Sequence, residues 1–243
     1  MASSVSKNSS PFKIVLGSSS PARREILADM GYEFTVMSPD IDERAIRREK
    51  PEELVKALAE AKAEAIKMKL HGDDSARARP QPTILITSDQ VMVSKGMIRE
   101  RPKSQEEARE FIKGISISNL YLGSLPVNLL HLAKKFQLCV LLLLVGYLGD
   151  KAFAVNYVLV TNLSNGASKG GWDIPEIYFH HIPEEFIQNV VKEGDMTCVA
   201  GGLKLTHPSV LPFIKQLVGT MDSVRGLPRE LTEKLIQEFV GAK

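Results

Sequence analysis

Hydrophobic positions in the first half of the chain alternate between short apolar runs and longer segments with helical spacing. The short runs predict strands at residues 13–16, 34–37 and 83–93. The clearest helix is predicted at 52–70, where apolar residues recur at three- and four-residue steps and Glu and Lys occupy the other face. Two further helices are expected, one from an N-cap at Ser20 and one at 105–113.

The second half continues the same alternation. Strand character appears at 157–162 and 176–180, and the polar, Gly-rich stretch 164–171 between them is interpreted as a hairpin connection. Helices are predicted at 183–192 and from Pro228 onward. Strands that alternate with helices predict an α/β fold with a mixed sheet flanked by helices.

The Leu- and Val-rich segment 119–149 does not fit this pattern. Its core at 138–148 is interrupted only by Cys139, Gly146 and Tyr147. This apolar core is shorter than the roughly 18 to 20 residues that a spanning helix needs. We therefore favour a buried helix or an anomalous insertion over a membrane segment, which stays open as an alternative.

Composition narrows the function classes. The 243 residues are 44% hydrophobic and 25% charged, as in an average globular protein, and the formal net charge is only +2. So small a charge argues against non-specific binding to nucleic acid or membranes. The two cysteines suggest neither a metal pair nor a disulfide framework. Residues 1–11 are polar, without a signal-peptide core, and predict a disordered leader on a cytoplasmic protein.

Two groups of residues could bind anions and metals. Ser18, Arg23 and their neighbours lie where a strand meets a helix N-terminus, an end that attracts anions; a capped helix with solvated arginines is the alternative. Asp40, Asp42 and Glu43 follow a strand end and could hold Mg²⁺, or could form a solvated acidic turn.

Asp89 is the strongest single candidate for chemistry. It interrupts an otherwise apolar strand, and an unpaired buried carboxylate costs several kcal/mol, so it must be paired, metal-bound or catalytic. Lys62 lies among alanines of the long helix, and Arg101 follows a turn; both could be functional cations or solvated side chains. The chain has no P-loop, no Gly-x-Ser-x-Gly elbow and no zinc-ligand spacing.

Several of these motifs, taken in order, resemble the Maf family. The matching segments are Ser18-Ser19-Ser20-Pro21-Ala22-Arg23-Arg24, Ser38-Pro39-Asp40-Ile41-Asp42-Glu43, Ala61-Lys62-Ala63 and Ser88-Asp89-Gln90, with later matches at Gly170-Gly171-Trp172, Ala200-Gly201-Gly202 and Gly226-Leu227-Pro228. The resemblance implies an elongated, two-lobed α/β fold with a central cleft. It also implies an enzyme, a nucleoside-triphosphate pyrophosphatase that uses a divalent cation (Mg²⁺ or Mn²⁺), and a homodimer.

The resemblance also assigns roles to individual residues. Asp89 matches the proton acceptor, Glu43 a metal-associated carboxylate, and Ser18, Arg23 and Lys62 the triphosphate-binding set. Arg101 falls where the family usually has lysine, so the charge is kept while its geometry changes. Attack on a phosphoanhydride needs neutralised phosphates, a metal and a base, which these residues would supply.

Three further positions bear on substrate choice under the same resemblance. Gln90 is similar to the branch that acts on 7-methyl-GTP, whereas Ala22 matches neither branch and Thr206 replaces an expected glutamate or glutamine. We expect residues 12–243 to form a single domain, interrupted at 117–155 by a non-homologous insertion. A catalytically degenerate, nucleotide-binding protein is the alternative reading of the insertion and of Arg101 and Thr206.

Overall fold

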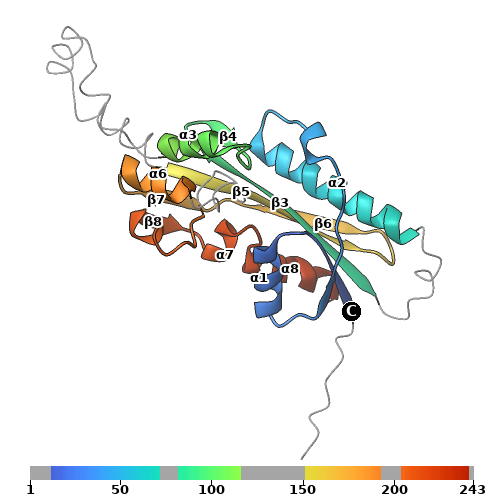
Figure 1. The fold of residues 1–243 in the computed structure, drawn as a ribbon. Coiled ribbons are helices and arrows are strands. Elements are labelled where there is room, and N and C mark those ends of the chain that lie inside the picture. The colour runs from blue at the N-terminus through green and yellow to red at the C-terminus, as the bar shows by residue number, and fades with distance from the viewer. Residues whose placement is uncertain (1–11, 72–81, 116–150, 193–203, 241–243) are drawn as a thin grey trace, which may run out of the picture. The chain divides into compact units, whose positions relative to one another are not determined.

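A computed structural model describes residues 12–71, 82–115, 151–192 and 204–240 (Figure 1). Its strands form an eight-stranded sheet in the order β2-β1-β3-β5-β7-β8, with β4 paired to β3 and β6 paired to β5. The pairings of β1 are parallel and those of β4, β6, β7 and β8 are antiparallel. The predicted α/β class with a mixed, helix-flanked sheet is therefore confirmed.

The chain divides into two compact units. The first comprises Met1–Asp89, Asn156–Asp173 and Met221–Lys243, and the second comprises Gln90–Val155 and Ile174–Thr220. Strands β3 and β5 each contribute residues to both units. The residues that gather around Asp89 all belong to the first unit, which is described first.

Three strands form the parallel part of the first unit: β1 (Lys13–Gly17), β2 (Phe34–Val36) and β3 (Thr83–Ser94). The register of β1 with β3 runs from Lys13 opposite Thr83 to Gly17 opposite Thr87. Parallel neighbours end at the same edge of a sheet, so the chain leaving β1 begins beside the Ser88-Asp89 step of β3. All three predicted strands are present.

Helix α1 (Pro21–Asp29) begins where the sequence predicts. The hydroxyl of Ser20 accepts a hydrogen bond from the backbone N–H of Arg23, and Pro21 is the first helical residue. The helix ends before Gly31, whose φ of +83° is a backbone conformation that glycine adopts without strain.

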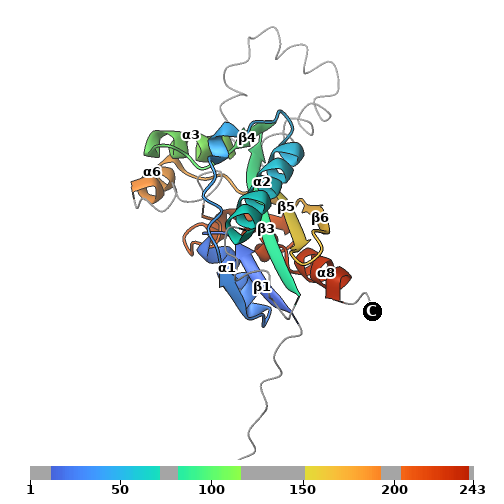
Figure 2. The same cartoon turned by 90° about the vertical axis from the view of Figure 1, so that its right-hand side faces the viewer.

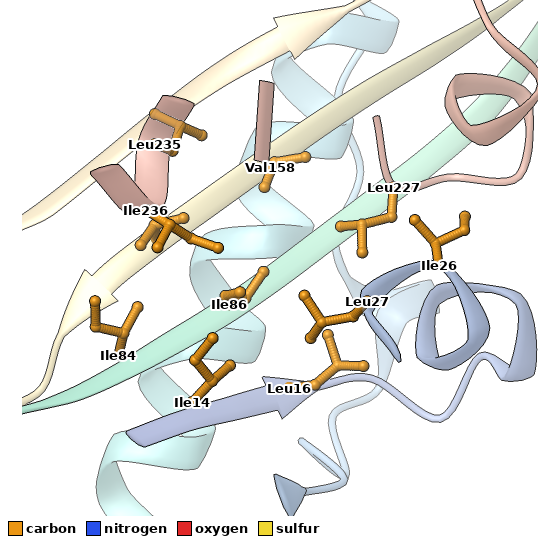
Figure 3. Packing of buried hydrophobic residues seen from close by; sticks show 11 residues of the cluster. Ile14, Leu16, Ile26, Leu27, Ile84, Ile86, Val158, Leu227, Leu235 and Ile236 are labelled. Atoms are coloured by element: carbon orange, nitrogen blue, oxygen red, sulfur yellow. The ribbon is translucent and has the colours of Figure 1, made fainter. Parts of the chain in front are cut away.

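Two longer helices cover opposite faces of these strands. Helix α2 (Pro51–His71) lies on one side of β3, while α1 and α8 (Arg229–Val240) lie on the other (Figures 1 and 3). The shared core contains Leu16, Ile86 and Ile236, each fully buried (Figure 3). Even-numbered residues of β3 enter this core, so the odd-numbered ones, Asp89 included, face α2.

The hairpin prediction at 164–171 is wrong in part. Strand β5 (Lys151–Asn162) pairs antiparallel with β6 (Ser168–Asp173), so only the first residues of that stretch form the connection. The glycines that suggested a loop have a packing role in β6. A Cβ added at Gly170 would collide with the Tyr157 hydroxyl, and one at Gly171 would lie 2.8 Å from a Leu231 methyl.

The second unit has three strands and two helices of its own. Its strands are β4 (Met97–Arg99), β7 (Glu176–Phe179) and β8 (Ile214–Val218), together with parts of β3 and β5. Helices α3 (Gln105–Ile115) and α6 (Glu184–Lys192) pack against each other, as both views show (Figures 1 and 2). Some short elements without a long periodic pattern were not expected from the sequence, namely β4, β8 and, in the first unit, α7 (Met221–Val224).

Two expectations concern residues outside the described ranges: the polar leader at 1–11 and most of the insertion predicted at 117–155. Strand β5 begins at Lys151, before the end of that predicted segment. Among the residues that are described, no helix has the length and apolar character needed to cross a membrane. The Leu-rich core at 138–148 lies outside the described residues.

Candidate active site

Asp89 lies on the face of β3 that α2 covers, and it is paired. Its Oδ1 accepts a hydrogen bond of 2.5 Å from Lys62 Nζ on α2. Both side chains are buried, Asp89 with 7% and Lys62 with 5% of its surface exposed. Two residues earlier on the same face of β3, Thr87 donates its hydroxyl to the carbonyl of Ala59, which fixes α2 on the strand. The structure thus brings together two of the residues singled out from the sequence.

Glu43 supplies the second carboxylate of this site. It opens the short 3-10 helix η1 (Glu43–Ala45), whose N-cap Asp42 accepts a hydrogen bond from the backbone N–H of Arg44. Glu43 Oε1 lies 2.9 Å from Lys62 Nζ, so one ammonium group contacts both carboxylates. The Glu43 side chain remains 53% exposed, whereas Asp89 is enclosed.

The acidic turn that precedes η1 does not act as one cluster. Asp40 has a φ of +46° and pairs with Lys69 and Ser38 on the surface. Asp42 serves as the N-cap of η1. Of the three carboxylates that the sequence grouped together, Glu43 is the one that contacts Lys62.

Burial dominates the electrostatics of Asp89. Loss of solvent raises the pKa of its carboxyl group, while the positive charges of Lys62 and Arg23 lower that pKa and Glu43 raises it further. The net direction is upward from the ordinary aspartate value. A carboxylate with a raised pKa is a stronger base, which suits it to accept a proton.

Arg23 anchors the backbone around Asp89. From α1, its Nε donates to the carbonyl of Gly226 at 2.9 Å, and its Nη1 donates to the carbonyl of Ser88 at 2.7 Å. The side chain is 9% exposed and its charge acts on Asp89. The sequence assigned Arg23 to phosphate binding alone, and the backbone contacts add a structural role.

Ser18 contributes to the start of α1. Its hydroxyl accepts a hydrogen bond from the backbone N–H of Ser20 at 3.1 Å, and its side chain is buried. Together with the Ser20 cap, this contact shapes the loop between β1 and α1. The first turn of α1 carries no acidic side chain, which keeps this helix end favourable for an anion.

The site has a carboxylate that could share a metal with phosphates, although not a closed protein cage. No group of three or more His, Cys, Asp or Glu residues with metal-binding geometry occurs within residues 12–71, 82–115, 151–192 and 204–240. Mg²⁺ usually takes one or two carboxylates and completes its shell with water and substrate phosphates. The exposed carboxylate of Glu43 fits that requirement.

The residues predicted to govern specificity are distributed over both units. Ala22 is half-buried on α1 in the first unit. In the second unit, Gln90 is half-buried on β3, whereas Arg101 and Thr206 are exposed. Of the residues matched to triphosphate binding, Ser18, Arg23 and Lys62 belong to the first unit, whereas Arg101 belongs to the second.

Three residues near the site were given no role from the sequence. Ser88 and Gly226 were matched only as parts of family motifs, and Asn156 was not singled out. Ser88 and Asn156 are fully buried, and the carbonyl of Gly226 accepts from both Arg23 and Ser88. The sequence placed Ser88 in the polar step of an apolar strand, which is the signal for its burial. The Gly226 carbonyl leaves no such signal, because any residue has one.

Comparison with known proteins shows the family to which the chain belongs. A family model described as Maf-like protein matches residues 13–124 and 144–239. A 7-methyl-GTP pyrophosphatase from Dictyostelium discoideum is 34% identical over 93% of this chain and 96% of its own length. The chain belongs to the Maf family, as its motifs suggested.

Bacterial relatives carry two different substrate names. A dTTP/UTP pyrophosphatase from Alkaliphilus metalliredigens is 24% identical over 89% of this chain and 90% of its own length. A 7-methyl-GTP pyrophosphatase from Idiomarina loihiensis is 43% identical, but over 39% of this chain and 44% of its own length. The chain is therefore similar to both kinds of named pyrophosphatase.

Proposed function

We propose that this chain is a nucleoside-triphosphate pyrophosphatase whose hydrolytic centre consists of Asp89, Lys62 and Glu43. The observation that carries the proposal is the contact of one buried ammonium group, Lys62 Nζ, with both carboxylates. The named relatives support the same reaction class, a hydrolase acting on acid anhydrides. The balanced reaction converts a nucleoside triphosphate and water into a nucleoside monophosphate and pyrophosphate.

Asp89 acts as the base in this proposal. Water must lose a proton as it attacks phosphorus, and a carboxylate with a raised pKa accepts that proton more readily than an ordinary aspartate. The apolar neighbours of Asp89 in β3 exclude bulk solvent from its inner side. Its hydrogen bond from Lys62 holds one carboxylate oxygen in place.

Positive charge on the protein would offset the charge of the triphosphate. Lys62 is within reach of both carboxylates and can be shared with a phosphate oxygen, because an ammonium group has three donors. Arg23 adds a buried positive charge whose hydrogen bonds to two carbonyls fix its position. Ser18 and the start of α1 provide the anion-favouring helix end.

Glu43 is the proposed metal-associated residue, with Asp89 beside it. A divalent cation such as Mg²⁺ or Mn²⁺ would neutralise phosphate charge and orient the leaving group. The exposure of Glu43 allows it to meet a hydrated cation that arrives with the nucleotide. Asp89, which is enclosed, then remains available to accept the proton.

For the substrate we propose a 7-methyl-GTP-like nucleotide over dTTP or UTP. The full-length relative with that name shares 34% identity, against 24% for the dTTP/UTP relative. Gln90 directly follows Asp89 and agrees with this preference by resemblance. The neutral Thr206 and small Ala22 leave fewer charged contacts for a base edge than the family pattern provides.

The test is product analysis with 7-methyl-GTP, UTP, dTTP and CTP side by side in the presence of Mg²⁺ or Mn²⁺. We expect equal amounts of pyrophosphate and monophosphate, with 7-methyl-GTP giving the highest kcat/KM. Release of single phosphates would contradict the proposed reaction. Nucleotide binding without turnover would establish the degenerate, nucleotide-binding alternative.

A further inference from the structure

Ser88 is a polar residue at the end of an apolar row. Ile84 and Ile86 lie on the face of β3 that α1 and α8 cover (Figure 3). Ser88 follows them on the same face because side chains of a strand alternate between its two faces. Ser88 is fully buried, so its hydroxyl has no access to solvent. A buried hydroxyl is retained at little cost only where it forms a hydrogen bond.

The partner of this hydroxyl is the carbonyl of Gly226. Ser88 Oγ donates to that oxygen at 3.0 Å, and Arg23 Nε donates to the same oxygen at 2.9 Å. Arg23 Nη1 also donates to the Ser88 carbonyl at 2.7 Å. The three residues thus form a closed set of buried hydrogen bonds, and both the side chain and the carbonyl of Ser88 take part.

The Gly226 turn is itself held in place. The backbone N–H of Gly226 donates to the carbonyl of Ser223, which also accepts from Asn156 Nδ2 at 2.9 Å. Asn156 is fully buried on β5. Gly226 has a φ of +92°, a conformation that other residues adopt only with strain. The acceptor that Ser88 reaches is therefore a fixed point of the first unit.

We infer that Ser88 is a positioning residue for Asp89, acting through the Gly226 carbonyl; the inference rests on the proposed role of Asp89 as the base. On the β1 edge of β3, the paired register ends at Thr87, one residue before Ser88, while β5 is the neighbour on the other edge. On the β1 side, Arg23 holds the carbonyl of the peptide group that joins Ser88 to Asp89, and the Ser88 side chain adds a second anchor. A displacement of about 1 Å at a reacting group can cost about 100-fold in rate, so this anchoring controls turnover.

The geometry separates this role from a general effect on folding. When Ser88 becomes alanine, the Gly226 carbonyl keeps its hydrogen bond from Arg23 and is not left buried without a donor. The cost to stability is therefore small compared with the loss of a buried ion pair. The lost restraint lies directly beside the base, so the rate is affected more than the fold.

The experiment compares Ser88→Ala with two other variants. Ser94→Ala is the matched control, because Ser94 lies on the same strand, is equally buried, and its hydroxyl has no hydrogen-bond partner among the described residues. Ser88→Thr keeps the hydroxyl and tests rescue. We expect Ser88→Ala to lower kcat about tenfold or more with little change in KM. Ser94→Ala should keep wild-type kcat, and Ser88→Thr should recover much of the loss.

Equal kcat for Ser88→Ala and Ser94→Ala would overturn the inference. If Ser88→Ala fails to fold, Ser88→Cys takes its place in the experiment. A cysteine side chain fills a similar space, and its thiol is a much weaker hydrogen-bond donor than the hydroxyl. Deuterium uptake over residues 84–93 gives a readout that needs no activity. Faster exchange around Ser88 and Asp89 in the alanine variant supports the inference, and unchanged exchange refutes it. Absence of turnover in the wild-type enzyme would instead refute the proposed function, so the two failures are distinguishable.

Discussion

Lys62 and Asp89 form a buried ion pair that links helix α2 to strand β3, with Nζ 2.5 Å from Oδ1. The pair accounts for two features that looked unrelated in the sequence, a lysine among alanines and an aspartate in an apolar strand. Each charge makes the burial of the other tolerable, because an unpaired charge in either place would cost several kcal/mol. Glu43 on the same ammonium group extends the pair to the surface.

Lys62→Met should shift the acid limb of the pH–rate profile. Lys62 lowers the pKa of Asp89, so its removal raises that pKa further and a higher pH is needed to generate the basic carboxylate. We also expect kcat/KM to fall by about 100-fold or more as phosphate charge is left uncompensated. The measurement is the pH dependence of kcat/KM. Lys67→Met is the control, because Lys67 lies on the same helix and pairs with the exposed side chain of Glu64. An acid limb at the same pH as in the wild-type enzyme would show that the ion pair with Lys62 does not set the pKa of Asp89.

Glu43→Gln should act on the metal and on Asp89 in distinguishable ways. Loss of a carboxylate should raise the Mg²⁺ concentration for half-maximal rate about tenfold. Because Glu43 raises the pKa of Asp89, its neutralisation should move the acid limb to lower pH, opposite to the Lys62 variant. Glu53→Gln, an exposed carboxylate paired with Lys50, is the control. If both variants need the same Mg²⁺ concentration for half-maximal rate, Glu43 does not bind the metal.

The elements with long patterns were predictable, and the irregular contacts were not. Helix α2 and strand β3 follow from apolar spacing over many residues, and the Ser20 cap from local chemistry. Strand β6 was missed because its glycines look like a loop in sequence, although they make room for Tyr157 and Leu231. Packing between residues distant in the chain decides such cases, and a single sequence does not reveal it.

The candidate site was likewise predictable only in part. Residue type and burial pattern pointed to Asp89, and the order of motifs pointed to Lys62 and Glu43 before any contact was known. The separation of Asp40 from Glu43 depends on Lys69, which pairs with Asp40 from a position on α2 about two helical turns after Lys62. Nothing in the sequence signals that contact. The bonds to the Gly226 carbonyl depend on a backbone atom, which the sequence cannot distinguish from any other.

Gly170→Ala should destabilise the β5–β6 hairpin. Its new Cβ would collide with the Tyr157 hydroxyl, and relieving that overlap should cost about 1–3 kcal/mol of unfolding free energy. Gly171→Ala meets only the end of the Leu231 side chain, which can move, so its cost should be smaller. Denaturant unfolding of the two variants provides the comparison. Equal stabilities would show that the Tyr157 packing is not the reason for glycine in β6.

Deletion of residues 125–143, the middle part of the insertion predicted at 117–155, tests that insertion. The family model aligns on both sides of these residues and leaves them out. We expect the shortened chain to fold and to hydrolyse the same nucleotide with a kcat/KM within about threefold of the full chain, since Ser18, Arg23, Glu43, Lys62 and Asp89 all lie in the first unit. Loss of turnover with a retained fold would show that the segment contributes to the enzyme.

The most direct test of the central claim compares the wild-type chain with Asp89→Asn in pyrophosphate release from 7-methyl-GTP. Asparagine keeps the shape of the side chain and removes its basicity, so turnover should fall at least about 1,000-fold while the fold is retained. Asp40→Asn, which alters an exposed carboxylate paired with Lys69, should retain wild-type turnover. A folded Asp89→Asn enzyme that releases pyrophosphate at the wild-type rate would contradict the assignment of Asp89 as the base.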